Sequence, residues 1–237
     1  MEIIQQPLQF TPDETRFGQR YVWDVPIRLT HWVTAASVIT LFATGMFISA
    51  PVVGPGTGEP ANHFLMGRVR EVHFVSAYAL VFSFIVRGYW FFAGNRYARS
   101  GVPRFWDRRW WNGLRIQILE YMSVNKGPAH VGHNALAGLS YVLMVGGIGL
   151  FQILTGFALY SQDNPRGFWD TALGWVIPLC GGAFRTQMLH HLASWGFVVF
   201  LILHIYIVLF GAARYKNGLA GAMISGEKFF REGDLDL

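Results

Sequence analysis

The sequence predicts an all-α integral membrane protein, a bundle of four transmembrane helices. Of its 237 residues, 52% are hydrophobic and only 14% are charged, a balance that soluble domains of this size rarely show. The apolar residues gather into four long runs, and a helix needs roughly 20 such residues to cross a bilayer. The four runs cover residues about 30–50, 72–93, 137–160 and 189–212. We therefore expect residues 1–237 to form a single membrane domain.

The basic residues predict how the bundle is oriented. Fifteen of the 19 Lys and Arg residues lie in the N-terminal segment, in the second connection with the end of the second run, and in the C-terminal tail. Positive charge favours the cytoplasmic side, so both termini are expected in the cytoplasm, with the chain in a bacterial inner membrane. The net charge is +5, and the basic residues lie beside apolar runs, where anionic lipid is a simpler partner than nucleic acid.

The first run follows a polar stretch of about thirty residues, and no small-residue cleavage site comes after the run, so we expect no secretory signal peptide. The second connection, about residues 103–124, has a different character because tryptophans lie among its arginines. Apolar residues at helical spacing follow them, at Leu114, Ile118 and Met122. This pattern predicts an amphipathic helix on the inner membrane surface, with an ordinary polar loop as the alternative.

Cysteine usage limits the kinds of redox cofactor that the chain can hold. Cys180 is the only cysteine. A single cysteine excludes an internal disulfide, a four-cysteine iron–sulfur cluster and the C-x-x-C-H attachment of c-type haem. Any redox cofactor must be held by other side chains.

Histidines inside the apolar runs are the main functional signal, because ionisable residues within a membrane span are costly and usually functional. His204 lies in the middle of the fourth run, and His190 precedes it by fourteen residues. Fourteen helical residues return to within about 40° of the same face, roughly 21 Å along the axis. The adjacent His191 would point about 140° away from His204, so we interpret it as a polar residue at the helix mouth.

The expected topology pairs these histidines with two others. His73 begins the second run on the outer side, at the depth of His190, and His31 begins the first run on the inner side, nearer His204. Each pair could supply two axial imidazoles to one haem iron between the helices. The alternative is a set of interhelical hydrogen bonds or a proton relay. A relay normally uses carboxylates, and no Asp or Glu lies deep in the four runs.

Other residues are weaker candidates for the surroundings of these sites. The fourteen-residue spacing recurs from His31 to Gly45 and from His73 to Arg87. Gly45 would leave room for the outer haem or serve ordinary helix packing, while Arg87 would bind a propionate or extend to the interface. Arg28 is a further candidate near the inner haem or the quinone.

His133 and Asn134 precede the third run and could bind a quinone head group. Asn134 could equally cap a helix. His130 lies in the same segment, and His63 lies in the outer loop, where we expect it to be solvated or to face a partner.

Several short motifs occur together along the chain. They are Arg28-Leu29-Thr30-His31-Trp32, Thr44-Gly45, Met66-Gly67-Arg68, Glu71-Val72-His73-Phe74, Gly94-Asn95-Arg96-Tyr97, Gly132-His133-Asn134, Thr155-Gly156-Phe157-Ala158-Leu159-Tyr160, and His190 with Trp195 and His204. Over essentially its entire length, the chain resembles the b-type cytochrome subunits of membrane-bound nickel–iron hydrogenases.

The resemblance implies two b haems, with His31, His73, His190 and His204 as the iron ligands. It further implies electron transfer from the iron–sulfur small subunit of a periplasm-facing hydrogenase to quinone, with hydrogen splitting on partner subunits, the large subunit among them. One alternative is the cytochrome b subunit of a formate dehydrogenase or a related quinone-linked oxidoreductase. Another is a membrane anchor or transporter without haem.

Overall fold

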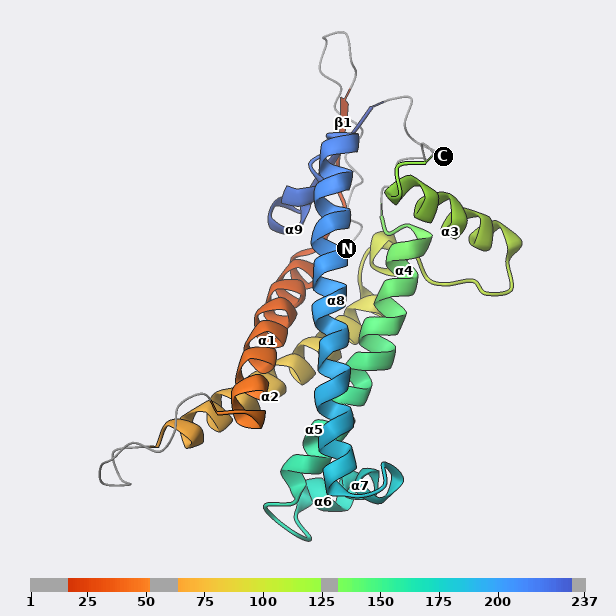
Figure 1. The fold of residues 1–237 in the computed structure, drawn as a ribbon. Coiled ribbons are helices and arrows are strands. Elements are labelled where there is room, and N and C mark those ends of the chain that lie inside the picture. Colours follow the sequence, from red (N-terminus) through yellow and green to blue (C-terminus); the bar gives the residue numbers. More distant parts are fainter. Residues whose placement is uncertain (1–16, 52–63, 125–131, 232–237) are drawn as a thin grey trace. The chain divides into compact units, whose positions relative to one another are not determined.

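The computed structural model describes residues 17–51, 64–124 and 132–231. Within them, four helical segments are long and apolar enough to cross a membrane, which confirms the predicted four-helix membrane fold (Figure 1). They are α1 (Val25–Ser49), α2 (Leu65–Ala93), the consecutive α4 (Ala135–Tyr141), η3 (Val142–Gly149) and α5 (Leu150–Ser161), and α8 (Ala183–Tyr215).

These helices extend beyond the apolar runs. α2 begins at Leu65 rather than near residue 72, and its first turns carry polar residues such as Arg68 and Glu71. α8 likewise begins at Ala183 rather than near residue 189. Hydropathy marks only the part that matches the hydrocarbon core, whereas polar side chains let the same helix continue into the interface.

The third span contains an irregularity that its apolar sequence does not reveal. The eight residues of η3 form a π-helix between α4 and α5, in a segment that includes Gly146, Gly147 and Gly149. Such wide turns are rare and often lie near functional sites. Large apolar side chains remain exposed on the long helices, among them Phe82, Ile85 and Ile202, as expected for surfaces that face lipid.

Shorter elements fill the connections. They are β1 (Phe17–Tyr21), η2 (Arg96–Arg99), α3 (Arg108–Tyr121), α6 (Phe168–Leu173), α7 (Val176–Leu179), η4 (Leu219–Gly221), α9 (Ala222–Ser225) and β2 (Glu227–Arg231). α3 lies within the segment that was predicted to be an amphipathic helix. The Asp107 side chain caps it by accepting a hydrogen bond from the Arg109 N–H.

The chain divides into two compact units. The terminal unit comprises Met1–Leu29, Arg87–Val142 and Leu201–Leu237, and the central unit comprises Thr30–Val86 and Leu143–Phe200. The terminal unit therefore holds both chain ends and α3. The central unit holds the larger parts of α1 and α2, all of α5 and the first half of α8.

In the terminal unit, the two strands join segments that lie about two hundred residues apart. β1 pairs antiparallel with β2, from Phe17 opposite Arg231 to Tyr21 opposite Glu227. The Trp23 N–H then donates to the Gly226 carbonyl at 3.0 Å. A small core follows, made of Val22, Trp23, Ile27, Ala98 and Ala222.

A polar anchor fixes the end of α2 to this core. Asp24 accepts hydrogen bonds from the Trp90 indole at 3.0 Å and from the Asn95 side chain at 2.9 Å. The Asn95 side-chain oxygen accepts from the Tyr97 and Ala98 N–H groups and so caps η2. The motif Gly94-Asn95-Arg96-Tyr97 therefore has a structural role within this unit.

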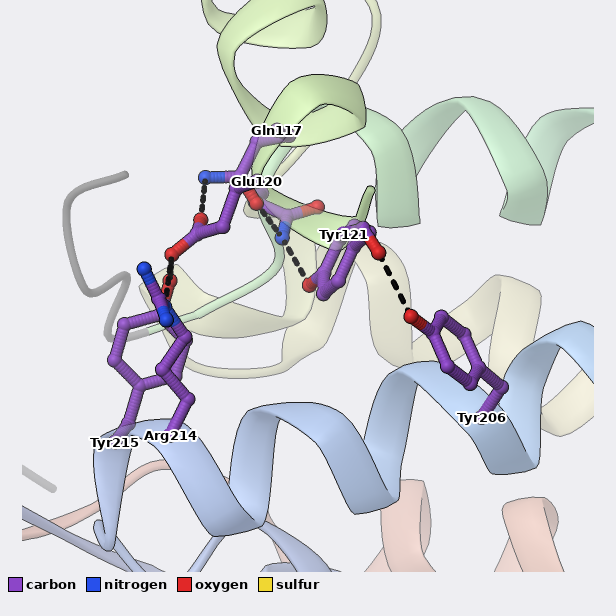
Figure 2. A network of polar contacts seen from close by, with 7 residues as sticks. Gln117, Glu120, Tyr121, Tyr206, Arg214 and Tyr215 are labelled. Atoms are coloured by element: carbon purple, nitrogen blue, oxygen red, sulfur yellow. Dashed lines mark hydrogen bonds and ion pairs between the residues drawn. The ribbon is translucent and has the colours of Figure 1, made fainter. Parts of the chain in front are cut away.

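A buried carboxylate joins α3 to the end of α8, also within the terminal unit. Glu120 is fully buried, and Figure 2 shows its side chain facing Gln117, Arg214 and Tyr215. Arg214 Nε lies 3.4 Å from the carboxylate, and the Tyr215 hydroxyl and the Gln117 amide donate to it. The Tyr206 hydroxyl also donates to the Tyr121 carbonyl at 2.8 Å. α3 is thus held by polar contacts with α8.

Candidate functional site

The central unit encloses a cavity between the helices that carry His73 and His190. Its volume is about 400 Å³, and it is lined by residues of α1, α2, α5 and α8. That volume lies within the range of about 300–1,000 Å³ that is typical of cofactor sites. Most of its wall is aliphatic or aromatic, as with Leu41, Phe42 and Phe157, so the two imidazoles are prominent polar groups in an apolar space.

Each of these histidines is held by a threonine on a neighbouring helix. Thr44 Oγ1 on α1 lies 2.8 Å from His73 Nδ1, and Thr155 Oγ1 on α5 lies 2.8 Å from His190 Nδ1. Thr155 is completely buried. These contacts fix one nitrogen of each ring and leave Nε2 as the atom that can bind a metal.

A glycine follows each threonine and lies beside the histidine ring. A Cβ atom at Gly45 would lie 3.4 Å from His73 Cε1, and one at Gly156 would lie 3.1 Å from His190 Cε1. Gly45 was predicted to leave space at this depth, and it does line the cavity. Thr44, Thr155 and Gly156 belong to the motifs that carry the resemblance, but the sequence predicted no role for them at the histidines.

Several further polar residues line the cavity and were not predicted, Gln152 and Arg70 among them. Gln152 donates from its side-chain amide to the His190 carbonyl at 2.9 Å, while its buried Oε1 atom has no hydrogen-bond partner among the described residues. Arg70 precedes His73 by one helical turn and is itself exposed, so it places a cation where the cavity wall meets the surface. Spacing along α5 could have indicated Gln152, which lies three residues before Thr155 on the same face.

His191 also lines the cavity, although the sequence predicted that it lies at the helix mouth and turns away from the ligand face. Of these two adjacent described residues, His190 is the one with a threonine hydroxyl on its ring nitrogen. The backbone carbonyl of His191 accepts a hydrogen bond from Ser194 Oγ at 2.6 Å. The contacts therefore favour His190, rather than His191, as the ligand.

The other predicted pair is divided between the two units. His31 belongs to α1 in the central unit, where its ring meets Trp32 edge-on at 5.1 Å. His204 belongs to α8 in the terminal unit. Their pairing on one iron stays a prediction. The predicted histidines His63 and His130 lie outside the described residues.

A second, smaller cavity lies in the terminal unit. It has a volume of about 170 Å³ and is lined by Arg87, Ser100, His133 and Tyr141 among others. Arg87 donates to the Ala98 carbonyl at 3.1 Å and lies over the Tyr141 ring. Within the part of the chain that the structure describes, its buried Nη1 atom has no hydrogen-bond partner. The His133 ring packs against Trp23 with centroids 4.6 Å apart.

Electrostatics keep His133 neutral. Burial of its ring, together with the positive charges of Lys228 and Arg87, lowers the pKa of His133 from 6.5 to about 3. Ser100 Oγ lies 3.3 Å from His133 Nδ1 and donates its own proton to the Tyr97 carbonyl at 2.7 Å. The ring therefore donates from Nδ1, which makes Nε2 a hydrogen-bond acceptor.

The remaining candidates have structural partners. Asn134 caps α4 by accepting from the Ala137 N–H at 2.8 Å, and its amide donates to Gln117 and to Tyr121. The capping alternative for Asn134 is therefore present in the structure. Arg28 donates to the Ile224 carbonyl and approaches the Tyr21 hydroxyl at 3.4 Å.

The donor set of the larger cavity fits haem. Across residues 17–51, 64–124 and 132–231, no three His, Cys, Asp or Glu side chains cluster as ligands for a bare metal ion. Two imidazoles in a largely apolar cavity would instead suit a metal whose other ligands belong to a macrocycle, and His73 and His190 are the residues that would hold it. The glycines beside the rings and the unpartnered Gln152 oxygen are consistent with a bulky group there.

Comparison with known proteins decides the family. The profile described as prokaryotic cytochrome b561 matches residues 22–226, which include all four candidate ligands. The chain belongs to this family. It is therefore a multi-pass membrane protein of the b-type cytochromes, whose cofactor is haem b. The resemblance inferred from the sequence motifs is confirmed.

Similar proteins agree with this assignment. A protein of Azotobacter vinelandii named "Probable Ni/Fe-hydrogenase B-type cytochrome subunit" is 38% identical over 90% of this chain and 89% of its own length. A protein of Cupriavidus necator with the same name is 37% identical over 90% and 88%. The Escherichia coli protein named "Probable Ni/Fe-hydrogenase 1 B-type cytochrome subunit" is 30% identical over 91% and 93%.

Proposed function

We propose that this chain is the haem-carrying membrane subunit of a nickel–iron hydrogenase and that it passes electrons from the hydrogenase iron–sulfur subunit to membrane quinone. The observation that carries the proposal is the cavity that brings His73 and His190 together, with the ring of each held at Nδ1 by a threonine. The names of relatives that cover about nine-tenths of the chain support the partner.

The chain's own residues have separate tasks in this proposal. His73 and His190 bind one haem through Nε2, Thr44 and Thr155 hold the rings, and the apolar wall of the cavity excludes water. Haem iron supplies one-electron chemistry. Arg70 offers a cation for the acidic substituents of the haem.

A second haem on His31 and His204 completes the proposed route. The fourteen-residue separation of His190 and His204 along the unbroken helix α8 supports two ligands at two depths. The distribution of Lys and Arg supports both termini in the cytoplasm, with the chain in a bacterial inner membrane, which makes His73 and His190 the outer pair. Electrons would then pass from this outer pair to the inner pair.

For quinone, the geometry favours the smaller cavity of the terminal unit. His133 presents a neutral ring with Nε2 as an acceptor, and Arg87 and Ser100 line the same space. Asn134 contributes by shaping the start of α4, since both its amide and its oxygen are engaged. Arg28 does not line this cavity and supports the adjacent chain ends.

The decisive experiment is purification of the intact complex through a tag on this chain. We expect nickel in the partner subunits, two b haems per chain, and reduction of the b-type absorbance when hydrogen is supplied. Molybdenum in place of nickel would support the formate dehydrogenase alternative. A purified chain without a b-type band in the reduced-minus-oxidised spectrum would overturn the cytochrome assignment.

A further inference from the structure

The surroundings of His73 and His190 repeat each other. On one side of the cavity, Thr44 and Gly45 of α1 contact His73 of α2. On the other side, Thr155 and Gly156 of α5 contact His190 of α8. In both cases the Thr Oγ1 to His Nδ1 distance is 2.8 Å, and the glycine faces the Cε1 edge of the same ring.

The repetition extends beyond the two contacts. An aromatic residue follows each histidine by five positions, Tyr78 in α2 and Trp195 in α8. Tyr78 packs on Phe157, which follows Gly156, with ring centroids 5.1 Å apart. Trp195 packs on Phe42, two residues before Thr44, with centroids 5.3 Å apart. Each helix pair thus holds a histidine and sends an aromatic ring to the other pair.

The direction of the hydrogen bonds follows from the threonine partners. Thr44 Oγ1 lies 2.7 Å from the Thr40 carbonyl, and Thr155 Oγ1 lies 2.7 Å from the Phe151 carbonyl. A carbonyl can only accept, so it takes the single hydroxyl proton. The hydroxyl oxygen must then accept from the histidine, which requires a proton on Nδ1. The neutral ring therefore has its free lone pair on Nε2.

We propose that Thr44 and Thr155 are paired positioning residues that fix His73 and His190 as Nδ1–H tautomers. By accepting from Nδ1–H, each hydroxyl also strengthens the imidazole as an electron donor to iron. Stronger donation stabilises the oxidised metal and lowers its reduction potential. This inference rests on the proposed function, because it needs His73 and His190 to be the ligands of the outer haem.

The test uses Thr155→Val and Thr44→Val in the intact complex, with Thr155→Ser and Thr44→Ser as conservative variants. Valine retains the shape of threonine but cannot accept a hydrogen bond. We expect one of the two b components to shift to a higher potential in an optical redox titration. Its low-spin EPR signal should also change, and its haem affinity should fall by about 10- to 100-fold. Serine should restore the wild-type values.

Thr186→Val is the matched control. Thr186 is also completely buried and lies one turn before His190 in α8. Its hydroxyl donates to the carbonyl of Gly182, the residue that precedes α8, rather than contacting a histidine. We expect this variant to retain the wild-type potentials. Haem loss in the valine and serine variants alike would indicate a packing role and overturn the inference, as would valine variants with unchanged potential and EPR signal.

His190→Ala separates this inference from the function on which it rests. If that variant keeps both haems, the ligand assignment itself is wrong. If it loses one haem while the valine variants match the wild type, the ligands stand and the role of the threonines is wrong.

Discussion

The histidine cavity of the central unit and the Glu120 cluster of the terminal unit are both polar sites among helices, but their hydrogen bonds leave different atoms available. Around Glu120, a carboxylate meets an arginine, a tyrosine and an amide, so protein groups satisfy the buried charge (Figure 2). Around His73 and His190, one nitrogen of each ring is bound and Nε2 is left as an acceptor.

The difference distinguishes a structural cluster from a ligand site. Buried polar groups that saturate one another fix the relative position of their helices. Polar groups that are satisfied on one side only, beside glycines and a cavity of about 400 Å³, leave both volume and bonding capacity for a cofactor. The following predictions test whether the two regions separate in this way, beginning with the largest expected effect.

Removing a ligand should affect haem content more than any other change. His190→Ala should lose one of two b haems per chain, because no other imidazole is held by Thr155. His191→Ala is the control and should retain both, although His191 lines the same cavity. Haem per chain is measured from the pyridine haemochrome spectrum. Equal loss from the two variants would contradict the choice of ligand.

Breaking the Glu120 cluster should reduce stability without removing the outer haem. Glu120→Leu leaves Arg214 and Tyr215 without their carboxylate, at an expected cost of about 1–3 kcal/mol in the free energy of unfolding. Glu120→Gln keeps the size and one acceptor and should cost less. Thermal unfolding in detergent, followed by tryptophan fluorescence, compares the stabilities, which should decrease from the wild type to Glu120→Gln to Glu120→Leu.

Haem content at the His73 and His190 site is the second readout for these Glu120 variants. It should stay at the wild-type level while the protein remains folded. Loss of the outer haem from Glu120→Gln would show that the two regions are not functionally separate.

How far the sequence predicts these regions depends on the range of the interactions. The four spans follow from local hydropathy. Helical spacing and topology predict His73 and His190 as a pair, and both line one cavity. Their role as ligands stays a prediction. The contacts of Thr44 and Thr155 with the histidines were not predicted, because a hydroxyl in an apolar helix normally bonds its own backbone. The Thr-Gly dipeptide, present in the first and the third span, was the signal that could have indicated them.

Long-range polar contacts could not be predicted from the pattern. Glu120 lies in an amphipathic segment in which a carboxylate would ordinarily face water. It is buried because Arg214 and Tyr215, more than ninety residues later, approach it. The same holds for β1 and β2, whose pairing joins the two ends of the described chain.

The two glycines of the histidine cavity should differ in their tolerance of a methyl group. At Gly156 the added Cβ would lie 3.1 Å from His190 Cε1, closer than ordinary contact, so Gly156→Ala should tilt the ring. At Gly45 the corresponding distance is 3.4 Å, which is ordinary contact. We expect a changed low-spin EPR signal for Gly156→Ala and a signal near the wild type for Gly45→Ala. The reverse order would contradict the ring positions.

The last prediction concerns pH and belongs to the terminal unit. The pKa of His133 is about 3 in the folded protein, below its ordinary 6.5, chiefly because its ring is buried. Between these values an unfolded chain takes up a proton that the folded chain does not, so the free energy of unfolding should fall as the pH drops from about 6.5 toward 3. Burial also lowers the pKa of Lys228, to about 8 from 10.5, so the contribution of Lys228 to the pH dependence of stability falls in a separate, alkaline range.

The variant His133→Asn tests this prediction. Asparagine keeps a donor for Ser100 but does not titrate, so the thermal stability of the variant should depend less on pH between 7 and 4.5 than that of the wild type. Parallel pH profiles for the two proteins would show that His133 does not stay neutral in the folded terminal unit.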